Sequence, residues 1–349
     1  MLALQGQDLP GAKWSIGLRG AGSTERDVDA AFDAGEIVRS WPMRGTLHVV
    51  AGEDIGWMLD LTAPAAIASS AQRRAVLGLE LADAERAREV VQRVLAERQV
   101  LTRDATLKAI EEAGVSTTGQ RGYHLLWYLA QTGTLVLGAT EGRQQTFALL
   151  DAWVPDRRKL ERDEALAELA LRFFRSHGPA TAADLARWAG LTVRDVRAGI
   201  AGSGERLATL ELGGVTYHVD PEIDIDTAAD MPSDPPARVH LLPGFDEYVL
   251  GYKDRSAVLV PEHSAAIVPG GNGVFRPTIA VDGEVSGTWR RANRGGRVVI
   301  EPTLFAPQPR WFAKALAAAV DQYGSYLERP TRALPSQLLL GDRRLDPPG

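Results

Sequence analysis

The stretch PATAADLARWAGLTVRDVRAGIAG, residues 179–202, carries the signals that decide the fold. Thr181 is a favourable N-cap residue for a short helix that ends at Gly190, and Thr192 is placed to cap a second helix. Two short helices joined by a glycine turn are typical of a helix-turn-helix. The sequence therefore predicts this arrangement over residues 181–202.

The residues on either side extend this stretch into a winged helix. ERDEALAELALRFFRSHG, residues 161–178, has apolar side chains at helical spacing and is followed by Pro179. RLATLELGGVTYHVD, residues 206–220, alternates around Gly213-Gly214, which is typical of a β-hairpin. We therefore predict a winged-helix unit over residues 156–228.

The same order of helices and hairpin recurs twice nearer the N-terminus. Residues 82–150 contain predicted helices followed by a hairpin that turns around Gly138–Gly142. STERDVDAAFDAGEIV, residues 23–38, predicts a capped helix, and VRSWPMRGTLHVV, residues 38–50, predicts another hairpin. The copies share architecture rather than sequence identity. We predict three tandem winged-helix units, at residues 1–51, 52–155 and 156–228.

The composition changes at residue 229, where the proline-rich segment ADMPSDPPAR indicates a linker. Beyond it, alternating segments predict strands, and Asp282-Gly283 is a strong two-residue hairpin turn. The segments are VHLLPGFDEYVLGY (239–252), VFRPTIAVDGEVSGTWRR (274–291) and RVVIEPTLF (297–305). Residues 309–327 predict a closing helix. The expected fold is α+β: three winged helices followed by a β-rich module over residues 229–349.

Composition excludes several classes of protein. The 349 residues include no cysteine, so disulfides, thiolate metal ligands and cysteine nucleophiles are excluded. No apolar run is long enough for a transmembrane helix and no secretory signal opens the chain, which favours the cytoplasm. The six histidines have no metal-ligand spacing, and no phosphate loop or dinucleotide fingerprint is present. We expect no metal and no cofactor.

A basic hairpin stands out against the net charge of −6. SGTWRRANRGGR, residues 286–297, predicts a hairpin on which Trp289 lies beside Arg290, Arg291 and Arg294. Arginines contact DNA phosphates, and a tryptophan can stack on a base or wedge a base step. The alternative is a solvated arginine-rich turn with a core tryptophan. We interpret the hairpin as a DNA contact, because it stands out against an acidic chain.

The N-terminus, MLALQGQDLPG, places Gln5 and Gln7 two residues apart, directly before Asp8. One interpretation is a helix end with ordinary surface residues. The other is a pair of amides aimed at a water and a substrate. The residues alone leave both interpretations open.

Four segments together resemble the AlkZ/YcaQ-like family of bacterial DNA glycosylases. They are Gln5-Gly6-Gln7-Asp8, RGTLHVV (44–50), LLPGFDEYVLGYKDR (241–255) and PTIAVDGEVSGTWRR (277–291). The resemblance covers residues 3–330 and implies tandem winged helices in a C-shaped, DNA-embracing channel. It implies removal of bulky alkylated purines from double-stranded DNA by a monomer, and unhooking of interstrand crosslinks.

The resemblance also implies which residues act. Gln5 and Gln7 match the catalytic Gln-x-Gln pattern of the AlkZ branch, although Gly6 stands where Ala or a larger apolar residue is usual. An N-alkylated purine is already cationic, so two amides that hold water and stabilise positive charge on the sugar are sufficient chemistry. Asp8 is either a base or a cap. His48 is a candidate lesion contact, and Arg44 a DNA contact.

Three further expectations follow. The first winged unit should begin with a helix before Gln5, so we expect in-frame coding sequence upstream of Met1, which a nearby in-frame stop codon would refute.

A non-catalytic DNA binder, either a regulator or a protein that sequesters adducts, would keep the basic hairpin and need no glutamine pair. An interaction module would use its winged helices for protein contacts, and salt dependence of DNA affinity would separate it from the first two classes.

Overall fold

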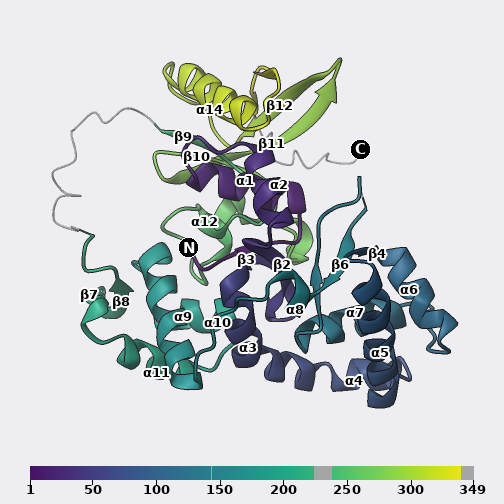
Figure 1. The fold of residues 1–349 in the computed structure, drawn as a ribbon. Coiled ribbons are helices and arrows are strands. Elements are labelled where there is room, and N and C mark those ends of the chain that lie inside the picture. The colour runs from purple at the N-terminus through teal and green to yellow at the C-terminus, as the bar shows by residue number, and fades with distance from the viewer. Residues whose placement is uncertain (143, 224–237, 339–349) are drawn as a thin grey trace, which may run out of the picture. The chain divides into compact units, whose positions relative to one another are not determined.

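The computed structural model describes residues 1–142, 144–223 and 238–338, which form two compact units. Unit 1 contains Met1–Leu9, Arg26–Ile223 and Gly251–Lys253. Unit 2 contains Pro10–Glu25 and the described parts of Asp224–Leu250 and Asp254–Gly349. The chain is therefore mixed α+β, as predicted (Figure 1). The division into three winged helices and the C-shaped channel stay predictions.

Unit 1 contains a six-stranded antiparallel sheet in the order β1-β3-β2-β5-β6-β4. Its strands are β1 (Ala3–Gln5), β2 (Ile37–Met43), β3 (Thr46–Ala51), β4 (Leu101–Thr102), β5 (Leu135–Leu137) and β6 (Thr146–Leu149). The predicted hairpin of residues 38–50 is confirmed as β2–β3, and its turn residues Arg44 and Gly45 both have positive φ, 52° and 65°. β2 also pairs with β5, so the hairpins of the first two predicted repeats share one sheet.

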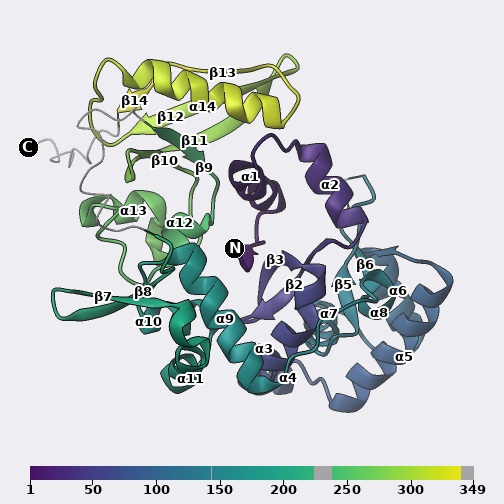
Figure 2. The ribbon, with the colours of Figure 1, turned by 60° about the vertical axis from the view of Figure 1, so that its left-hand side comes forward.

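Unit 1 also contains helices, of which some pack against this sheet and others pack with one another (Figure 2). They are α2 (Glu25–Asp33), α3 (Ile55–Ser69), α4 (Ala71–Val76), α5 (Leu81–Glu97), α6 (Arg103–Glu112), α7 (Arg121–Gln131), α8 (Leu150–Trp153), α9 (Arg162–His177), α10 (Ala182–Ala189) and α11 (Val193–Ser203). α3 contacts β2, α7 and α9, and its buried Trp57 donates to Asp54 Oδ1 at 2.9 Å. Asp54 is fully buried and pairs with Arg172 of α9, which ties α3 to α9.

The segment that opened the sequence analysis folds as expected. Thr181 Oγ1 accepts the Asp184 N–H at 3.2 Å, and Thr192 Oγ1 accepts the Asp195 N–H at 3.1 Å. Gly190 ends α10 in the left-handed region, at φ 73°. The hairpin that follows α11 consists of β7 (Ala208–Leu212) and β8 (Val215–Val219). The caps, the glycine turn and the hairpin could all be predicted from the sequence, because each depends on the chemistry of a few neighbouring residues.

Unit 2 is a sheet in the order β13-β12-β11-β10-β9, with β14 also pairing with β12. Its strands are β9 (Val239–Leu242), β10 (Thr278–Val281), β11 (Glu284–Arg294), β12 (Arg297–Leu304), β13 (Thr331–Ala333) and β14 (Gln337–Leu338). The helices are α1 (Leu9–Arg19), α12 (Glu247–Leu250), α13 (Ser264–Ile267) and α14 (Phe312–Tyr326). Short 3-10 turns lie in unit 1 at Gly52–Asp54 and Gly204–Arg206, and in unit 2 at Pro261–His263 and Pro269–Gly271. The Asp282-Gly283 turn and the closing helix are confirmed.

A strand predicted beyond residue 242 is wrong, because residues 247–250 form α12 instead. Asp246 causes this change: its Oδ1 accepts the Tyr248 N–H at 3.0 Å, which starts a helical turn. Burial on its own would raise the pKa of Asp246, but hydrogen bonds and charge from Arg19 and the Ser15 hydroxyl hold that pKa below its usual range. Asp246 thus joins α1 to the turn after β9.

No described helix combines the length and apolar character needed to cross a membrane.

Candidate functional site

The predicted glutamine pair lies where β1 ends, at one edge of the unit 1 sheet. Gln5 is the last residue of β1 and pairs with His48 of β3, while Gln7 lies in the loop that leads to α1. Gln5 is 7% exposed, whereas Gln7 and Asp8 are exposed. Gln5 therefore does not lie at a helix end, and the two glutamines have different environments.

The orientation of both amides follows from their donors. The Leu47 N–H donates to Gln7 Oε1 at 3.1 Å, and Arg44 Nη2 donates to Gln5 Oε1 at 3.2 Å. A backbone N–H and a guanidinium have no acceptor atom, so each must face an amide oxygen. Both catalytic candidates are thus held through their carbonyl oxygens.

Arg44 connects Gln5 to the C-terminal end of α10. Besides Gln5, its guanidinium donates to the carbonyl oxygens of Trp188 and, at 3.3 Å, of Arg187. A cation at the carbonyl end of a helix is electrostatically favourable. Gly190 makes room for this contact, because a Cβ there would lie 3.0 Å from Arg44 Cγ. Arg44 was predicted to contact DNA, whereas in the structure its guanidinium donates to these protein acceptors.

His48 is fully buried, with 0% exposure. Its Nδ1 lies 2.8 Å from the Thr46 carbonyl oxygen, which can only accept, so Nδ1 carries the proton. Nε2 then faces Arg44 Nη2 at 3.4 Å as an acceptor. The buried position of His48 therefore does not support the predicted lesion contact. Instead, His48 contacts the Arg44 guanidinium.

Arg39 of β2 is a residue that the sequence analysis missed. It is 8% exposed and lies under the glutamine loop, where its Nε donates to the Gly6 carbonyl oxygen at 2.7 Å. Burial lowers the pKa of Arg39 to about 10, while the charge of Asp8 acts in the opposite direction. An arginine inside the strand segment IVRSW, next to apolar residues, was the available signal, because a buried cation needs acceptors.

The basic hairpin of unit 2 consists of β11 and β12 and differs from its predicted role in one residue. Trp289 is 6% exposed; its Nε1–H donates to the Leu242 carbonyl oxygen at 2.8 Å and its ring packs edge-on against Tyr323. The proposed stacking of Trp289 on a base is corrected: it is a core residue, because β11 turns alternate side chains inward.

The arginines of this hairpin remain on the surface. The side chains of Arg290 and Arg294 are 79% and 59% exposed, and both pair with Glu301, at 2.8 and 2.6 Å. Arg291 is exposed too, and its Nη1 donates to the Tyr323 hydroxyl at 2.9 Å. Two arginines share one carboxylate, so this group keeps a positive charge available to a polyanion.

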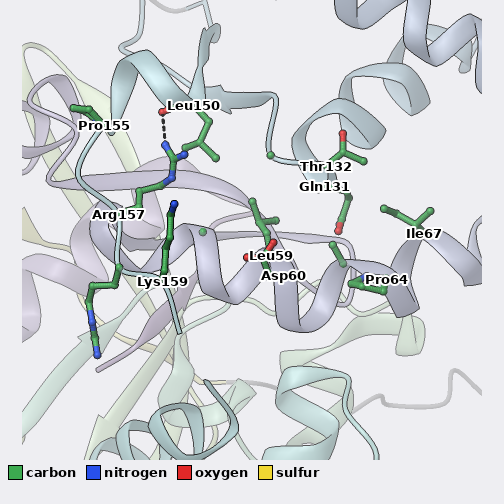
Figure 3. A pocket seen from close by; sticks show the side chains of 14 residues that line it. Leu59, Asp60, Pro64, Ile67, Gln131, Thr132, Leu150, Pro155, Arg157 and Lys159 are labelled. Atoms are coloured by element: carbon green, nitrogen blue, oxygen red, sulfur yellow. Dashed lines mark hydrogen bonds between the residues drawn. The ribbon is translucent and has the colours of Figure 1, made fainter. Parts of the chain in front are cut away.

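A separate pocket of about 490 Å³ lies on α3 and contains none of the predicted site residues (Figure 3). Leu59, Asp60 and Pro64 of α3 form one side, and Arg157 and Lys159 face them from the segment after α8. Arg157 is already engaged by the carbonyl oxygen of Leu150 at 3.1 Å. The pocket therefore adds nothing to the glutamine site. Within the described residues, no cluster of three or more His, Cys, Asp or Glu side chains could hold a metal ion.

The chain is similar to known proteins in sequence and in fold. A sequence model of the family described as "DNA glycosylase AlkZ-like" matches residues 1–326. The chain is 28% identical over 305 residues to an interstrand DNA cross-link repair glycosylase from Streptomyces sahachiroi, covering 83% of this chain and 80% of that protein. The solved structure of the Streptomyces sahachiroi DNA glycosylase AlkZ superposes with a TM-score of 0.73 and 25% identity, over 95% of this chain and 91% of that one. This chain belongs to the AlkZ-like family of DNA glycosylases.

Proposed function

We propose that this protein is a monofunctional DNA glycosylase that hydrolyses the N-glycosidic bond of bulky N-alkylated purines and also unhooks interstrand crosslinks. Family membership and the name of the Streptomyces relative support the reaction class. One observation supports the assignment of catalysis to particular residues: Gln5 and Gln7 lie close in the chain, and each is held through its amide oxygen. Catalytic groups that are fixed before substrate arrives need no reorganisation in the transition state.

The two environments suggest different tasks for the two glutamines. Gln7 is exposed and its Oε1 accepts one bond from Leu47, whereas a carbonyl oxygen can accept two, so we assign the attacking water to Gln7. Gln5 is buried against Arg44 and His48, and we assign it to placement of the sugar and its developing positive charge. Asp8 is exposed beside Gln7 and serves as an acceptor for the proton that water releases.

The reaction balances without any further reactant. The water oxygen bonds to C1′ as the bond from C1′ to the purine nitrogen breaks. The electron pair of that bond neutralises the cationic alkylpurine, which leaves as a neutral base. The water proton passes to Asp8 or to solvent, and an abasic site remains in the DNA.

The proposed partner is duplex DNA that contains an alkylated purine, bound by a monomer in the cytoplasm, where bacterial DNA lies. The winged-helix units at residues 1–51, 52–155 and 156–228, and the exposed arginines of the β11–β12 hairpin, would supply the phosphate contacts.

Single-turnover base excision on a duplex with one N7-alkylguanine tests the proposal. The parent should release the base, and the Gln5→Ala/Gln7→Ala double variant should lose about 100-fold or more in rate while keeping its DNA affinity. Gln92→Ala, an exposed amide on α5, is the matched control and should keep the full rate.

Binding without base release by the parent would contradict the proposal. It would move the protein to the class that sequesters adducts. Excision that survives the double substitution would instead keep the enzyme and remove the glutamines from its site.

A further inference from the structure

We propose that Arg39 is a positioning residue that holds the Gln5–Gln7 loop in its catalytic geometry. This inference rests on the proposed function, because it concerns the same site. The residue touches neither water nor DNA in this role; it acts through the backbone carbonyl groups of Gly6 and Gln7.

Three hydrogen bonds of one guanidinium carry the inference. Arg39 Nε donates to the Gly6 carbonyl oxygen at 2.7 Å, Nη2 to the Gln7 carbonyl oxygen at 3.4 Å, and Nη1 to Gln145 Oε1 at 3.3 Å. A guanidinium is planar and its donors have fixed directions, so these acceptors are fixed relative to one another. The loop is therefore anchored to β2 and, through Gln145, to the β5–β6 hairpin.

The peptide of Gly6 is held from two sides. Its N–H donates to the Leu47 carbonyl oxygen of β3 at 2.7 Å, while its carbonyl oxygen accepts from Arg39. A Cβ at Gly6 would lie 3.1–3.2 Å from the backbone atoms of His48, so the loop sits close against β3. The spacing between the Gln5 and Gln7 side chains thus depends on β2 and β3 together.

Arg39 is not available as a phosphate contact. It is 8% exposed and its donors point to protein oxygens. A DNA-contacting arginine sets affinity and its salt dependence, whereas a positioning residue sets the rate of the bound complex. The two roles therefore predict opposite kinetic signatures.

The experiment compares Arg39→Lys and Arg39→Met with the parent, on the full chain. Arg39→Lys keeps the charge but cannot reproduce the planar set of donors, so we expect its single-turnover rate to fall about 100-fold. Its dissociation constant for the duplex and the slope of affinity against salt should not change. Gln145→Leu removes one of three bonds and should cost less, below about 10-fold.

A second readout does not depend on catalysis. Amide hydrogen exchange at Gly6 and Leu47 should accelerate in Arg39→Lys, since the Gly6 N–H lies in the anchored loop and the Leu47 N–H of β3 donates to the Gln7 side chain of that loop. Arg172→Lys is the matched control, because Arg172 pairs with the buried Asp54 in the same unit, away from the loop. It should lower the melting temperature and leave both the rate and the loop exchange unchanged.

The outcomes separate the two proposals. A parent without base release would overturn the proposed function, while loop exchange would still decide the role of Arg39. An active parent with Arg39→Lys at full rate, or with unchanged loop exchange, would overturn the positioning role. Equal losses of rate in Arg39→Lys and Arg172→Lys would assign Arg39 to general stability and also overturn it.

Discussion

Two β-hairpins in this protein carry arginines, and they use them differently. In the β2–β3 hairpin of unit 1, Arg39 and Arg44 donate mainly to carbonyl oxygens and to Gln5. In the β11–β12 hairpin of unit 2, Arg290 and Arg294 extend into solvent and pair with Glu301. An arginine bound to neutral carbonyl groups holds the chain in place, whereas one paired with a surface carboxylate can exchange that partner for a phosphate.

The comparison shows that residue type alone does not identify a DNA contact. Both hairpins are basic in sequence, and both were assigned DNA-contacting residues. The partners of each guanidinium separate them.

The largest effect concerns the core of the β11–β12 hairpin. Trp289→Ala should destabilise unit 2 by about 4 kcal/mol, because it removes a buried aromatic side chain and its bond to the Leu242 carbonyl oxygen. Trp289→Phe keeps most of the packing and should cost about 1 kcal/mol. Urea denaturation of the full chain measures both values.

The same variants test whether Trp289 touches DNA. Trp289→Phe should bind the duplex as the parent does when measured well below its unfolding transition. A clear loss of affinity in this still-folded variant would return Trp289 to the DNA interface and weaken the contrast between the two hairpins.

The next effect concerns Arg44 in the β2–β3 hairpin. If Arg44 mainly orients Gln5, Arg44→Met should lower the single-turnover rate about 100-fold, and Arg44→Lys about 10-fold, with little change in affinity. If it mainly contacts phosphate, Arg44→Lys should keep the rate, and Arg44→Met should reduce the salt slope by about 0.9. Rates at saturating protein, together with binding measured over a salt series, distinguish the two roles.

Much of the fold was predictable wherever the signal is local. The ends of α10 and α11 lie where they were expected: Thr181 and Thr192 are the N-caps, and Gly190 ends α10. These ends were predictable because caps and left-handed turns depend on single residues. α3 was missed, since IGWMLDLTAPAAIAS is apolar on most sides and contains Pro64, so it shows no helical period. A helix buried between other elements carries no amphipathic pattern that a sequence can display.

Within the candidate site, only the two glutamines were predictable. The resemblance pointed to Gln5 and Gln7, but β1 is three residues long, too short for its pairing with β3 to show as a pattern. Arg39 reaches Gln145 across more than one hundred positions of sequence, and such a contact leaves no local trace. What the sequence lacks is the tertiary pairing that brings acceptors to a buried cation.

The smallest effect concerns the exposed arginines. The Arg290→Gln/Arg294→Gln variant should bind duplex DNA about 10-fold more weakly at moderate salt, and its salt slope should fall by about 1.8, since each lost phosphate contact removes about 0.9. The rate of base release from the bound complex should not change. Titration of a labelled duplex across a salt series measures the slope.

Glu301→Gln provides the matched variant of opposite sign. Glu301 holds both arginines at present, so its neutralisation should free two cations and strengthen DNA binding, more so at low salt than at high salt. Weaker binding in Glu301→Gln would mean that the carboxylate arranges the arginines for DNA rather than competing with it. In that case the arginines of the β11–β12 hairpin would be held in place as those of β2–β3 are, and the difference between the two hairpins would lie only in what holds them.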